Sequence, residues 1–589
     1  MIGPGWFGCH PACCRLGEWG ISALPILSSS SHVPLGRDGV LALGLVLALA
    51  TPAGAQVLPG AVQPGRDRSG PALPTQPDFD FSIEAPHRSA VPRAVDEVHF
   101  KLSDIKISGA TTITAPTFRP LYQGLIGKDI TLADILDVAD KIEAEYRARG
   151  YLLVRAYVPP QRVRDGVFTI NVVEGYLSNV TLQGGDADTR AQIRHYLAPA
   201  TASRPLTLSS IEHGLLLTND IPGISATGVL RPSPDTPGAS DLVVDVAQPW
   251  IAGGVAIDNR GSRFSGIWTV SGDVEFNGVF GEDQLGITVT SAPTSLEQVA
   301  GTVRYRRAIG DDGLIGSLIA SVTHGEPGST LSAAGVLTDS YAVGPRLTYP
   351  LIRSRAETLL LDGGITVQDA SVNIAGFGIT HDQWRVFDLG GSYQQNGVLG
   401  GAGVWTATFD VSQGLPFLGA TSNGDPKASR LGAQFDFTKL TAFSRLAMPL
   451  GENFSAVVSA SGQFSFSRLI TGEQVSFGGT QIGRGYDPGA ITGDHGIGGS
   501  AELRYDVRFT EEYLKALEPY VYVDAAQTWY RKDPSLKNQN IASVGGGVRF
   551  WLAYNVTASL EGAHTLHAVP GSDAGKIASK ILLDLSVRF

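Results

Sequence analysis

The sequence predicts two small α+β modules followed by a transmembrane antiparallel β-barrel of about 16 strands. Three observations support this prediction. Residues 97–248 combine strand-like alternation with helical periodicity, in an arrangement that occurs twice. Residues 249–589 lose the helical periodicity and alternate between apolar and polar side chains almost throughout. An apolar segment that precedes both regions has the features of a secretory signal peptide.

The composition limits the classes of protein to which the chain can belong. Its 589 residues exceed one ordinary domain and predict about two to four. Charged residues make up 17%, below the rough quarter that is typical of soluble domains. The net charge of −11 argues against a nucleic-acid partner. No run approaches the roughly 18 apolar residues that a membrane helix needs.

The predicted signal peptide covers residues 1–55. Its apolar core lies at residues 40–50, after Arg37 and shortly before an Ala-x-Ala sequence that ends at Ala55. We expect cleavage after Ala55, and an over-long start upstream of the signal. A lipoprotein is disfavoured because no cysteine follows the cleavage point. A mature chain without cysteine fits a compartment in which folding does not depend on disulfides. The cysteines of the sequence all lie upstream, namely Cys9, Cys13 and Cys14.

A flexible linker is predicted at residues 56–96, which are rich in Pro and Gly, and the first module at residues 97–175. Thr131, with Asp134 three positions later, predicts the cap of a helix over residues 132–146. The predicted strands of this module occupy residues 100–107, 151–158 and 166–173.

The second module, residues 176–248, repeats this plan after about 75 residues. Its predicted strands occupy residues 177–182, 225–230 and 241–246, and its predicted helices residues 187–197 and 209–218.

Several short motifs in these modules resemble one protein family. Residues 146–153 (YRARGYLL), 158–161 (VPPQ) and 173–175 (VEG) resemble the first polypeptide-transport-associated (POTRA) domain of two-partner secretion transporters. Residues 215–223 (LLLTNDIPG) resemble the second POTRA domain of the same family. This is the TpsB family, of the haemolysin and filamentous-haemagglutinin secretion and activation type. The resemblance implies that residues 97–175 form POTRA 1 and residues 176–248 form POTRA 2, both in the periplasm.

The alternating pattern of residues 249–589 fits two architectures. In a soluble sandwich the polar face meets water, whereas in a membrane barrel the apolar face meets lipid and the polar face lines the lumen. The pattern continues for too many residues for one sandwich, and a secretion signal is present. The chain also ends on a strand with a terminal Phe589, which resembles the insertion signal of bacterial outer-membrane barrels. We therefore predict a barrel of about sixteen strands.

A long Gly-rich loop at residues 471–499, after the predicted eleventh strand, carries the sequence Arg484-Gly485-Tyr486. Long loops without secondary structure are usually functional or disordered. Asp524 lies on a strand whose alternation points its side chain into the lumen. A guanidinium from an inward-folded loop would gain charge-assisted, bidentate hydrogen bonds from this carboxylate. The family resemblance implies this contact, although Gly483 stands where the family has valine, so the apolar anchor is either weaker or moved to Ile482.

No catalytic, metal-binding or cofactor motif is present in the predicted mature chain, so we expect neither enzyme activity nor a cofactor. The resemblance implies a monomeric outer-membrane transporter of an adhesin- or haemolysin-like exoprotein, captured by its N-terminal secretion domain. Two alternatives stay open. One is an assembly factor of the same superfamily, which inserts other barrels into outer-membrane lipid. The other is a passive porin or receptor.

POTRA 1 supplies a candidate site for the exoprotein. An unfolded chain offers unpaired backbone groups, which the edge of a sheet can satisfy by strand addition. The predicted groove lies between the helix at 132–146 and the strand at 151–158. Arg147 and Arg149 at its rim would steer an acidic passenger, or they are simply solvated charges at a helix end. The residues proposed to form this site are Arg147, Arg149, Tyr151, Val154 and Ala156.

Overall fold

The structure is a computed structural model, and it describes Gln63, residues 80–83 and residues 99–589 except 235, 237, 294, 295, 534 and 535. The predicted signal peptide, its cleavage site at Ala55 and the three cysteines lie outside the described residues. In the part of the chain that is described, no helix is both long enough and apolar enough to cross a membrane.

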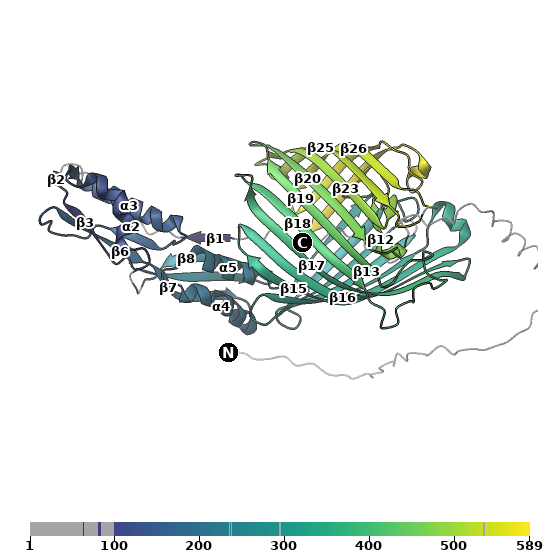
Figure 1. Cartoon of the computed structure of the whole chain (residues 1–589), viewed down its shortest axis with the longest axis horizontal. Coiled ribbons are helices and arrows are strands. Elements are labelled where there is room, and N and C mark those ends of the chain that lie inside the picture. Colours follow the sequence, from purple (N-terminus) through teal and green to yellow (C-terminus); the bar gives the residue numbers. More distant parts are fainter. Residues whose placement is uncertain are drawn as a thin grey trace, which may run out of the picture. The chain divides into compact units, whose positions relative to one another are not determined.

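The first module is a small sheet covered by two helices (Figure 1). Parallel β3 (Asp104–Ser108) and antiparallel β5 (Val154–Tyr157) flank β6 (Val167–Glu174), in the order β3-β6-β5. A separate pair joins β2 (His99–Lys101) to β4 (Asp129–Thr131). The helices are α2 (Ala115–Tyr122) and α3 (Leu132–Ala148).

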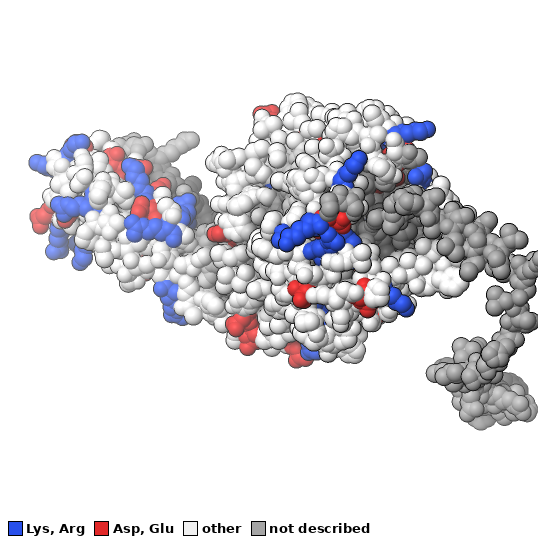
Figure 2. Space-filling view, turned by 45° about the vertical axis from the view of Figure 1, so that its right-hand side comes forward, with Lys and Arg blue, Asp and Glu red and all other residues white. Residues whose placement is uncertain are grey.

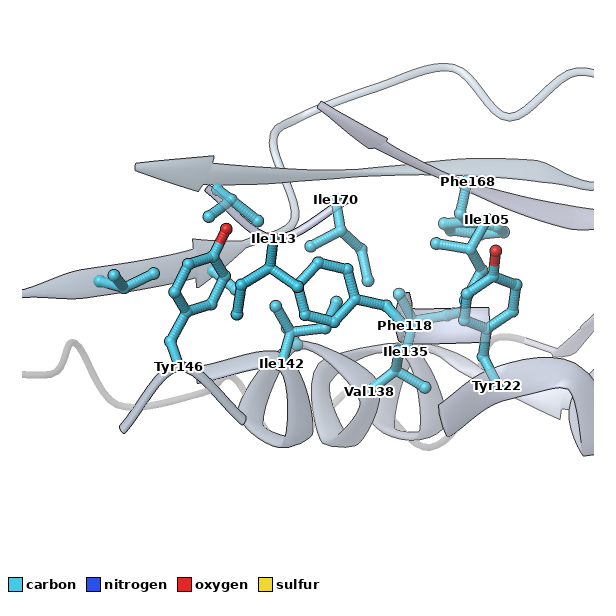
Figure 3. Packing of buried hydrophobic residues seen from close by; sticks show 14 of the residues in the cluster. Ile105, Ile113, Phe118, Tyr122, Ile135, Val138, Ile142, Tyr146, Phe168 and Ile170 are labelled. Carbon is cyan, nitrogen blue, oxygen red and sulfur yellow. The ribbon is translucent and has the colours of Figure 1, made fainter. Parts of the chain in front are cut away.

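The capping box predicted for α3 is present. Asp134 N–H donates to Thr131 Oγ1 at 3.4 Å, and Thr131 N–H donates to Asp134 Oδ2 at 2.8 Å. The inward face of α3 packs Ile135, Ile142 and Tyr146 beneath the sheet, where the ring of Phe118 from α2 fills the space between them (Figure 3). Burial of this apolar stripe, rather than helix propensity alone, fixes the helix on the sheet.

Two features of this module differ from the prediction. The single strand expected at residues 100–107 is two strands, β2 and β3, because the chain turns at Leu102 and Ser103 to pair with different partners. Helix α2 was not predicted, because prolines at its first turn and at position 120 mask the helical pattern.

The second module has a four-stranded sheet in the order β1-β8-β9-β7. Strands β7 (Tyr176–Gly184), β8 (Ser225–Pro232) and β9 (Ala239–Ala247) follow the predicted pattern. Helices α4 (Ala187–Ala202) and α5 (Leu208–Asp220) pack on it. The fourth strand, β1 (Asp80–Ile83), comes from the segment predicted as a linker and pairs in parallel with β8.

The LLLTNDIPG motif of this module has two structural roles. The Asn219 side chain accepts from Ala226 N–H at 2.8 Å and donates to the carbonyls of Leu215 and Ala226, which fixes the connection from α5 to β8. Asp220 accepts a bidentate pair from Arg353, at 2.7 Å from Nε and 2.6 Å from Nη2. Arg353 ends β15 (Val336–Arg353) of the C-terminal region, so the motif joins the second module to that region.

The C-terminal region is a barrel of antiparallel strands (Figure 1). Pairing of β10 (Ile251–Asp258) with β28 (Ser579–Arg588) closes it. It has sixteen strands among the described residues when the two-residue β24 is counted as the continuation of β23. The loop with Arg484 follows the eleventh strand, as predicted. The strands are β10 (Ile251–Asp258), β11 (Thr269–Asn277), β12 (Asp283–Ser291), β13 (Gln298–Ile309), β14 (Leu314–Gly325), β15 (Val336–Arg353), β16 (Glu357–Ile374), β17 (Phe377–Val398), β18 (Gly403–Gly414), β19 (Thr438–Pro449), β20 (Phe454–Ser465), β23 (His495–Tyr505), β24 (Val507–Arg508), β25 (Leu514–Trp529), β26 (Gln539–Leu552), β27 (Val556–Thr565) and β28 (Ser579–Arg588).

The two faces of the barrel wall differ as the alternation predicts. On β25, Val521 and Val523 are about half exposed on the outer face, whereas Tyr522 and Asp524 between them are buried on the inner face. On the side shown in Figure 2, charged residues are dense over the N-terminal modules and sparse over the barrel wall. An apolar outer band with polar side chains inside is the pattern of a membrane barrel.

Candidate functional site

The loop between β20 and β23 carries Arg484-Gly485-Tyr486 to the inner wall. Within the loop, β21 (Val475–Phe477) and β22 (Ile491–Gly493) pair with each other and frame residues 481–487. Gly483 has a φ of 85°, a conformation that residues with side chains rarely adopt. A Cβ atom there would lie 2.5 Å from Cδ1 of Ile541 on β26. Glycine, where the resembling family has valine, therefore allows the close approach of loop and wall.

Arg484 and Asp524 are in direct contact. Arg484 Nε donates to Asp524 Oδ2 at 3.1 Å and Nη2 donates to Oδ1 at 3.1 Å, which is a bidentate arrangement. The backbone N–H groups of Gly483 and Arg484 also donate to Oδ2, at 3.2 and 2.9 Å. Asp524 is completely buried, and Arg484 is 7% exposed. One carboxylate on β25 thus holds the loop through both its backbone and its arginine.

Glu502 on β23 is a second acidic partner that the sequence analysis did not identify. Arg484 Nη1 donates to Glu502 Oε2 at 2.5 Å, and the guanidinium carbon lies 3.3 Å from the ring centroid of Tyr522. Strand pairing explains the convergence, since Glu502 is opposite Tyr522 and Ser500 is opposite Asp524. Ser500 Oγ accepts from Nη2 at 3.1 Å. The guanidinium is therefore enclosed by two carboxylates, a hydroxyl and an aromatic face.

The charges around Arg484 belong to a larger network on the inner wall. Arg549 donates to Glu502 at 3.0 Å and also pairs with Glu518. The hydroxyls of Tyr520 and Tyr522 both donate to Glu561, at 2.6 and 3.1 Å. Arg260, just beyond β10, reaches Glu561 at 3.3 Å and binds Asp584 on β28 at 2.7 Å. This network therefore spans β23 to β28 and crosses the closure of the barrel.

Tyr486 and Asp487 anchor the other side of the loop. The Tyr486 hydroxyl lies 2.8 Å from the carbonyl oxygen of Ala542 and 2.9 Å from that of His567. Its ring packs with Ile482 and Ile541 in a buried apolar cluster. Asp487 accepts from Lys580 Nζ on β28 at 2.5 Å. The loop is thus held at three points on four wall strands.

These contacts hold the loop against the inner wall of the barrel. A cavity of about 480 Å³ lies beside Arg484, lined by residues that include Arg260, Tyr520, Glu561 and Asp584. Removing one member of a buried ion pair costs about 3–5 kcal/mol, because the other charge stays buried and unpaired. The loop therefore leaves this position only if its partners become hydrated together or exchange partners.

The residues proposed for the POTRA 1 groove contact different partners in the structure. Arg147 lies 3.5 Å from Glu143, and Arg149 lies 2.7 Å from Glu145, both one helical turn earlier. Tyr151 forms a backbone bridge to Thr207 of the second module, and its side chain packs against the core of the first module. These pairings favour the alternative of solvated charges at a helix end.

Val154 and Ala156 lie on β5, which is an edge strand as predicted. Their side chains are buried in the core. The backbone N–H of Ala156 points away from β6 and donates to Oε1 of Glu143 at 2.9 Å. Glu143, which the sequence analysis did not identify, is itself buried and therefore caps the free edge that an added strand would use.

Comparisons with known proteins identify the family to which the chain belongs. The family model described as "Haemolysin secretion/activation protein ShlB/FhaC/HecB" matches residues 238–550, and that of the ShlB-type POTRA domain matches residues 100–175. The outer membrane transporter CdiB of Escherichia coli O6:K15:H31 (strain 536 / UPEC) is 25% identical over an alignment of 459 residues that covers 74% of this chain and 73% of CdiB. The heme/hemopexin transporter protein HuxB of Haemophilus influenzae (strain 86-028NP) is 22% identical over 498 residues, covering 81% of this chain and 85% of HuxB.

The solved structure of CdiB from Escherichia coli has the same fold. It aligns with a TM-score of 0.63 and 21% sequence identity, covering 85% of this chain and 93% of CdiB. The structural match establishes the fold. The family model matches more than half of the chain and therefore establishes the family. The chain belongs to the haemolysin secretion/activation protein ShlB/FhaC/HecB family.

Proposed function

We propose that the chain is an outer-membrane transporter of two-partner secretion. Its POTRA modules capture an unfolded exoprotein in the periplasm, and its barrel passes the exoprotein to the outside. The observation that carries this proposal is the buried attachment of the Arg484 loop to Asp524 and Glu502 inside a closed sixteen-strand barrel. A loop that occupies the lumen but is held by polar contacts is suited to a pore that opens when a passenger enters.

The finer properties of this transporter are also proposals. The passenger is an adhesin- or haemolysin-like exoprotein, recognised through its N-terminal secretion domain, and a single barrel embedded in outer-membrane lipid carries out transport. Folding of the passenger outside the cell provides the driving force. The POTRA modules and barrel act by binding, with no catalytic step.

The three candidate functions, secretion, barrel assembly and passive transport, predict different defects in a cell that lacks the protein. Relatives are transporters by name, which favours secretion over barrel assembly. A simple porin has no need of two modules with the fold of POTRA domains.

Deletion of the gene, with complementation from a plasmid, tests the proposal. We expect the exoprotein to be lost from the medium, to accumulate in or be degraded in the periplasm, and to return on complementation. Other outer-membrane proteins should keep their normal abundance. A general loss of outer-membrane barrels with normal secretion would instead identify an assembly factor.

A further inference from the structure

Three extracellular loops meet at one part of the barrel rim. The chain enters β10 directly from the periplasmic POTRA 2, so β10 ends outside, and every second connection after it is also extracellular. The loops that follow β18, β20 and β25 are among these connections. Arg468, in the loop after β20, donates from Nη1 to the carbonyl of Leu431 at 2.9 Å and from Nη2 to the carbonyl of Lys532. One guanidinium therefore ties the loop after β20 to the loops after β18 and β25.

Cationic side chains outnumber carboxylates where these loops meet. The described cations there are Arg430, Arg468, Arg531 and Lys532, and the carboxylates are Asp494 and Asp533. Arg430 engages both carboxylates, because its Nη1 donates to Asp494 at 2.6 Å and its Nη2 to Asp533 at 3.3 Å. Asp494 is completely buried, whereas Arg468 is partly exposed and Lys532 is exposed. The surplus positive charge therefore reaches the surface at Arg468 and Lys532.

An apolar surface adjoins these cations on the outer face of the wall. Phe464 on β20 and Phe466 just beyond it are about half exposed, whereas Ser465 between them is completely buried. The two rings lie 5.1 Å apart in an edge-to-face arrangement, and the Phe464 ring lies 4.8 Å from that of His495. Phe466 N–H donates to the carbonyl of Thr438 at 2.9 Å, which continues the strand pairing to the rim. This aromatic surface ends two residues before Arg468.

Another part of the same rim lacks this combination. The extracellular connections at residues 292–297 and 326–335 contain no Lys or Arg, and each carries a glutamate, Glu297 or Glu326. Aromatic girdles at the membrane boundary are general to membrane barrels, so the phenylalanines alone would not mark a site. The conjunction of exposed aromatic rings with exposed cations distinguishes the part of the rim between β20 and β25.

We propose that this part of the rim binds a phosphate-bearing lipid of the outer leaflet. The lipid phosphates accept hydrogen bonds from Arg468 and Lys532, since guanidinium and ammonium groups both bind phosphate. The acyl chains lie over Phe464 and Phe466, which a free phosphate ion would leave exposed. A lipid bound in this way bridges the loops that follow β20 and β25. The inference requires only that the barrel spans the outer membrane, so it does not rest on secretion.

Native mass spectrometry of the full-length protein in nonionic detergent tests the proposal. The probes are diphosphoryl lipid A and its monophosphoryl form, which has the same acyl chains and one phosphate fewer. Lys532→Gln removes an exposed cation and leaves Arg468 with its contact to Leu431. Lys576→Gln is the matched control, because Lys576 is also exposed and extracellular but lies in the loop after β27. Phe466→Ser removes part of the apolar surface.

We expect Lys532→Gln to bind diphosphoryl lipid A about five-fold more weakly than the parent, the factor that one cation contributes near a charged lipid surface. The parent should also bind the monophosphoryl form more weakly than the diphosphoryl form. Phe466→Ser should weaken the binding of both lipids, because both place acyl chains on the aromatic surface. Lys576→Gln should have the Kd of the parent, and inorganic phosphate in large excess should leave the lipid bound.

Equal Kd values for the parent and Lys532→Gln would overturn the proposal, as would equal losses in Lys532→Gln and Lys576→Gln. Displacement of the lipid by inorganic phosphate would also overturn it, because the cations would then form a site for a free anion. Since the measurement requires neither passenger nor secretion, its failure is distinct from a failure of the proposed function, which the deletion experiment tests.

Discussion

At the scale of single residues, Arg484 shows how several polar contacts hold one side chain inside a barrel in a place where water can replace them. Its guanidinium is surrounded by Asp524, Glu502, Ser500 and Tyr522, all on neighbouring strands. The five N–H donors of a guanidinium match this set of acceptors, whereas the single ammonium group of a lysine would not. Because the lumen is polar, water replaces these contacts once the loop moves, which lowers the cost of release relative to a dry protein core.

The first prediction concerns the pairing of Arg484 with Asp524. Arg484→Ala and Asp524→Ala should each leave the barrel inserted and lower secretion of the exoprotein. If the two side chains act as one unit, the double variant should be little worse than either single variant. Secretion is measured by immunoblot of the medium, with outer-membrane abundance as the control. Additive losses, or normal secretion by both single variants, would contradict the pairing.

Part of this site was predictable from the sequence. Alternation along one strand placed Asp524 in the lumen, because Val521 and Val523 must face lipid. Glu502 was not predictable, since its position opposite Tyr522 depends on the register between β23 and β25. The hydrogen bond from Ala156 to Glu143 likewise depends on how α3 packs on β5.

Glu174 shows how one carboxylate joins two parts of POTRA 1. It lies in the VEG motif at the end of β6, accepts from the backbone N–H groups of Thr111 and Thr112 at 2.9 Å each, and accepts from the Tyr146 hydroxyl at 2.7 Å. Burial favours the neutral acid, but these hydrogen bonds outweigh it and hold the pKa of Glu174 below its ordinary value of 4.5. Burial, together with the hydrogen bond to this carboxylate, raises the pKa of Tyr146.

The second prediction follows from this lowered pKa. A carboxylate whose pKa is lower in the folded state contributes stability above its unfolded pKa, and that contribution is lost as the pH falls through the folded pKa. Glu174→Gln should therefore destabilise residues 97–248 by about 1 kcal/mol at pH 7. It should also reduce the loss of stability that the parent shows below about pH 4.5. Urea unfolding of this fragment by circular dichroism checks both. A parent and variant with the same pH dependence would contradict the role of Glu174.

At the scale of elements, the longest and most periodic segments were predictable and the shortest were not. The helix α3 was expected from its capping box and apolar stripe, both of which are local in the sequence. Strand β1 was assigned to a linker because four residues are too few to show alternation, and its pairing with β8 is a tertiary contact. Helix α2 was missed because proline lowers helix propensity, although tertiary packing of Phe118 holds the helix.

The third prediction concerns the β5 edge of POTRA 1. Val154→Pro removes a backbone donor at the β5 edge and should weaken passenger binding only if that edge receives the passenger. Glu143 already caps this edge, so we expect the folded full-length variant to bind the passenger with a Kd within about two-fold of the parent's. Such a change is well under the roughly 1.4 kcal/mol that corresponds to a tenfold change in Kd. Cooperative unfolding of the variant is the control. A large loss of passenger binding would show that the β5 edge receives the passenger.

The whole molecule combines a periplasmic receptor with a pore whose interior carries a retained loop. The barrel as a whole was predictable because each strand repeats the same apolar–polar alternation, so errors at single boundaries do not change the total of about sixteen. The contact between Asp220 of POTRA 2 and Arg353 of β15 was not predictable, since it joins residues 133 positions apart. This bidentate ion pair links the end of α5 to the end of β15.

Site-specific photo-cross-linking of a stalled passenger tests most directly whether the exoprotein crosses through the lumen. Thr408 and Phe409 are neighbours on β18, where the exposed Phe409 faces lipid and Thr408 faces the interior. A photoreactive residue is introduced at one position or the other, and the passenger is stalled by a folded domain fused to its end. We predict adducts with the passenger from position 408 and none from position 409. Equal adducts from both positions, or adducts from position 409 alone, would contradict transport through the barrel.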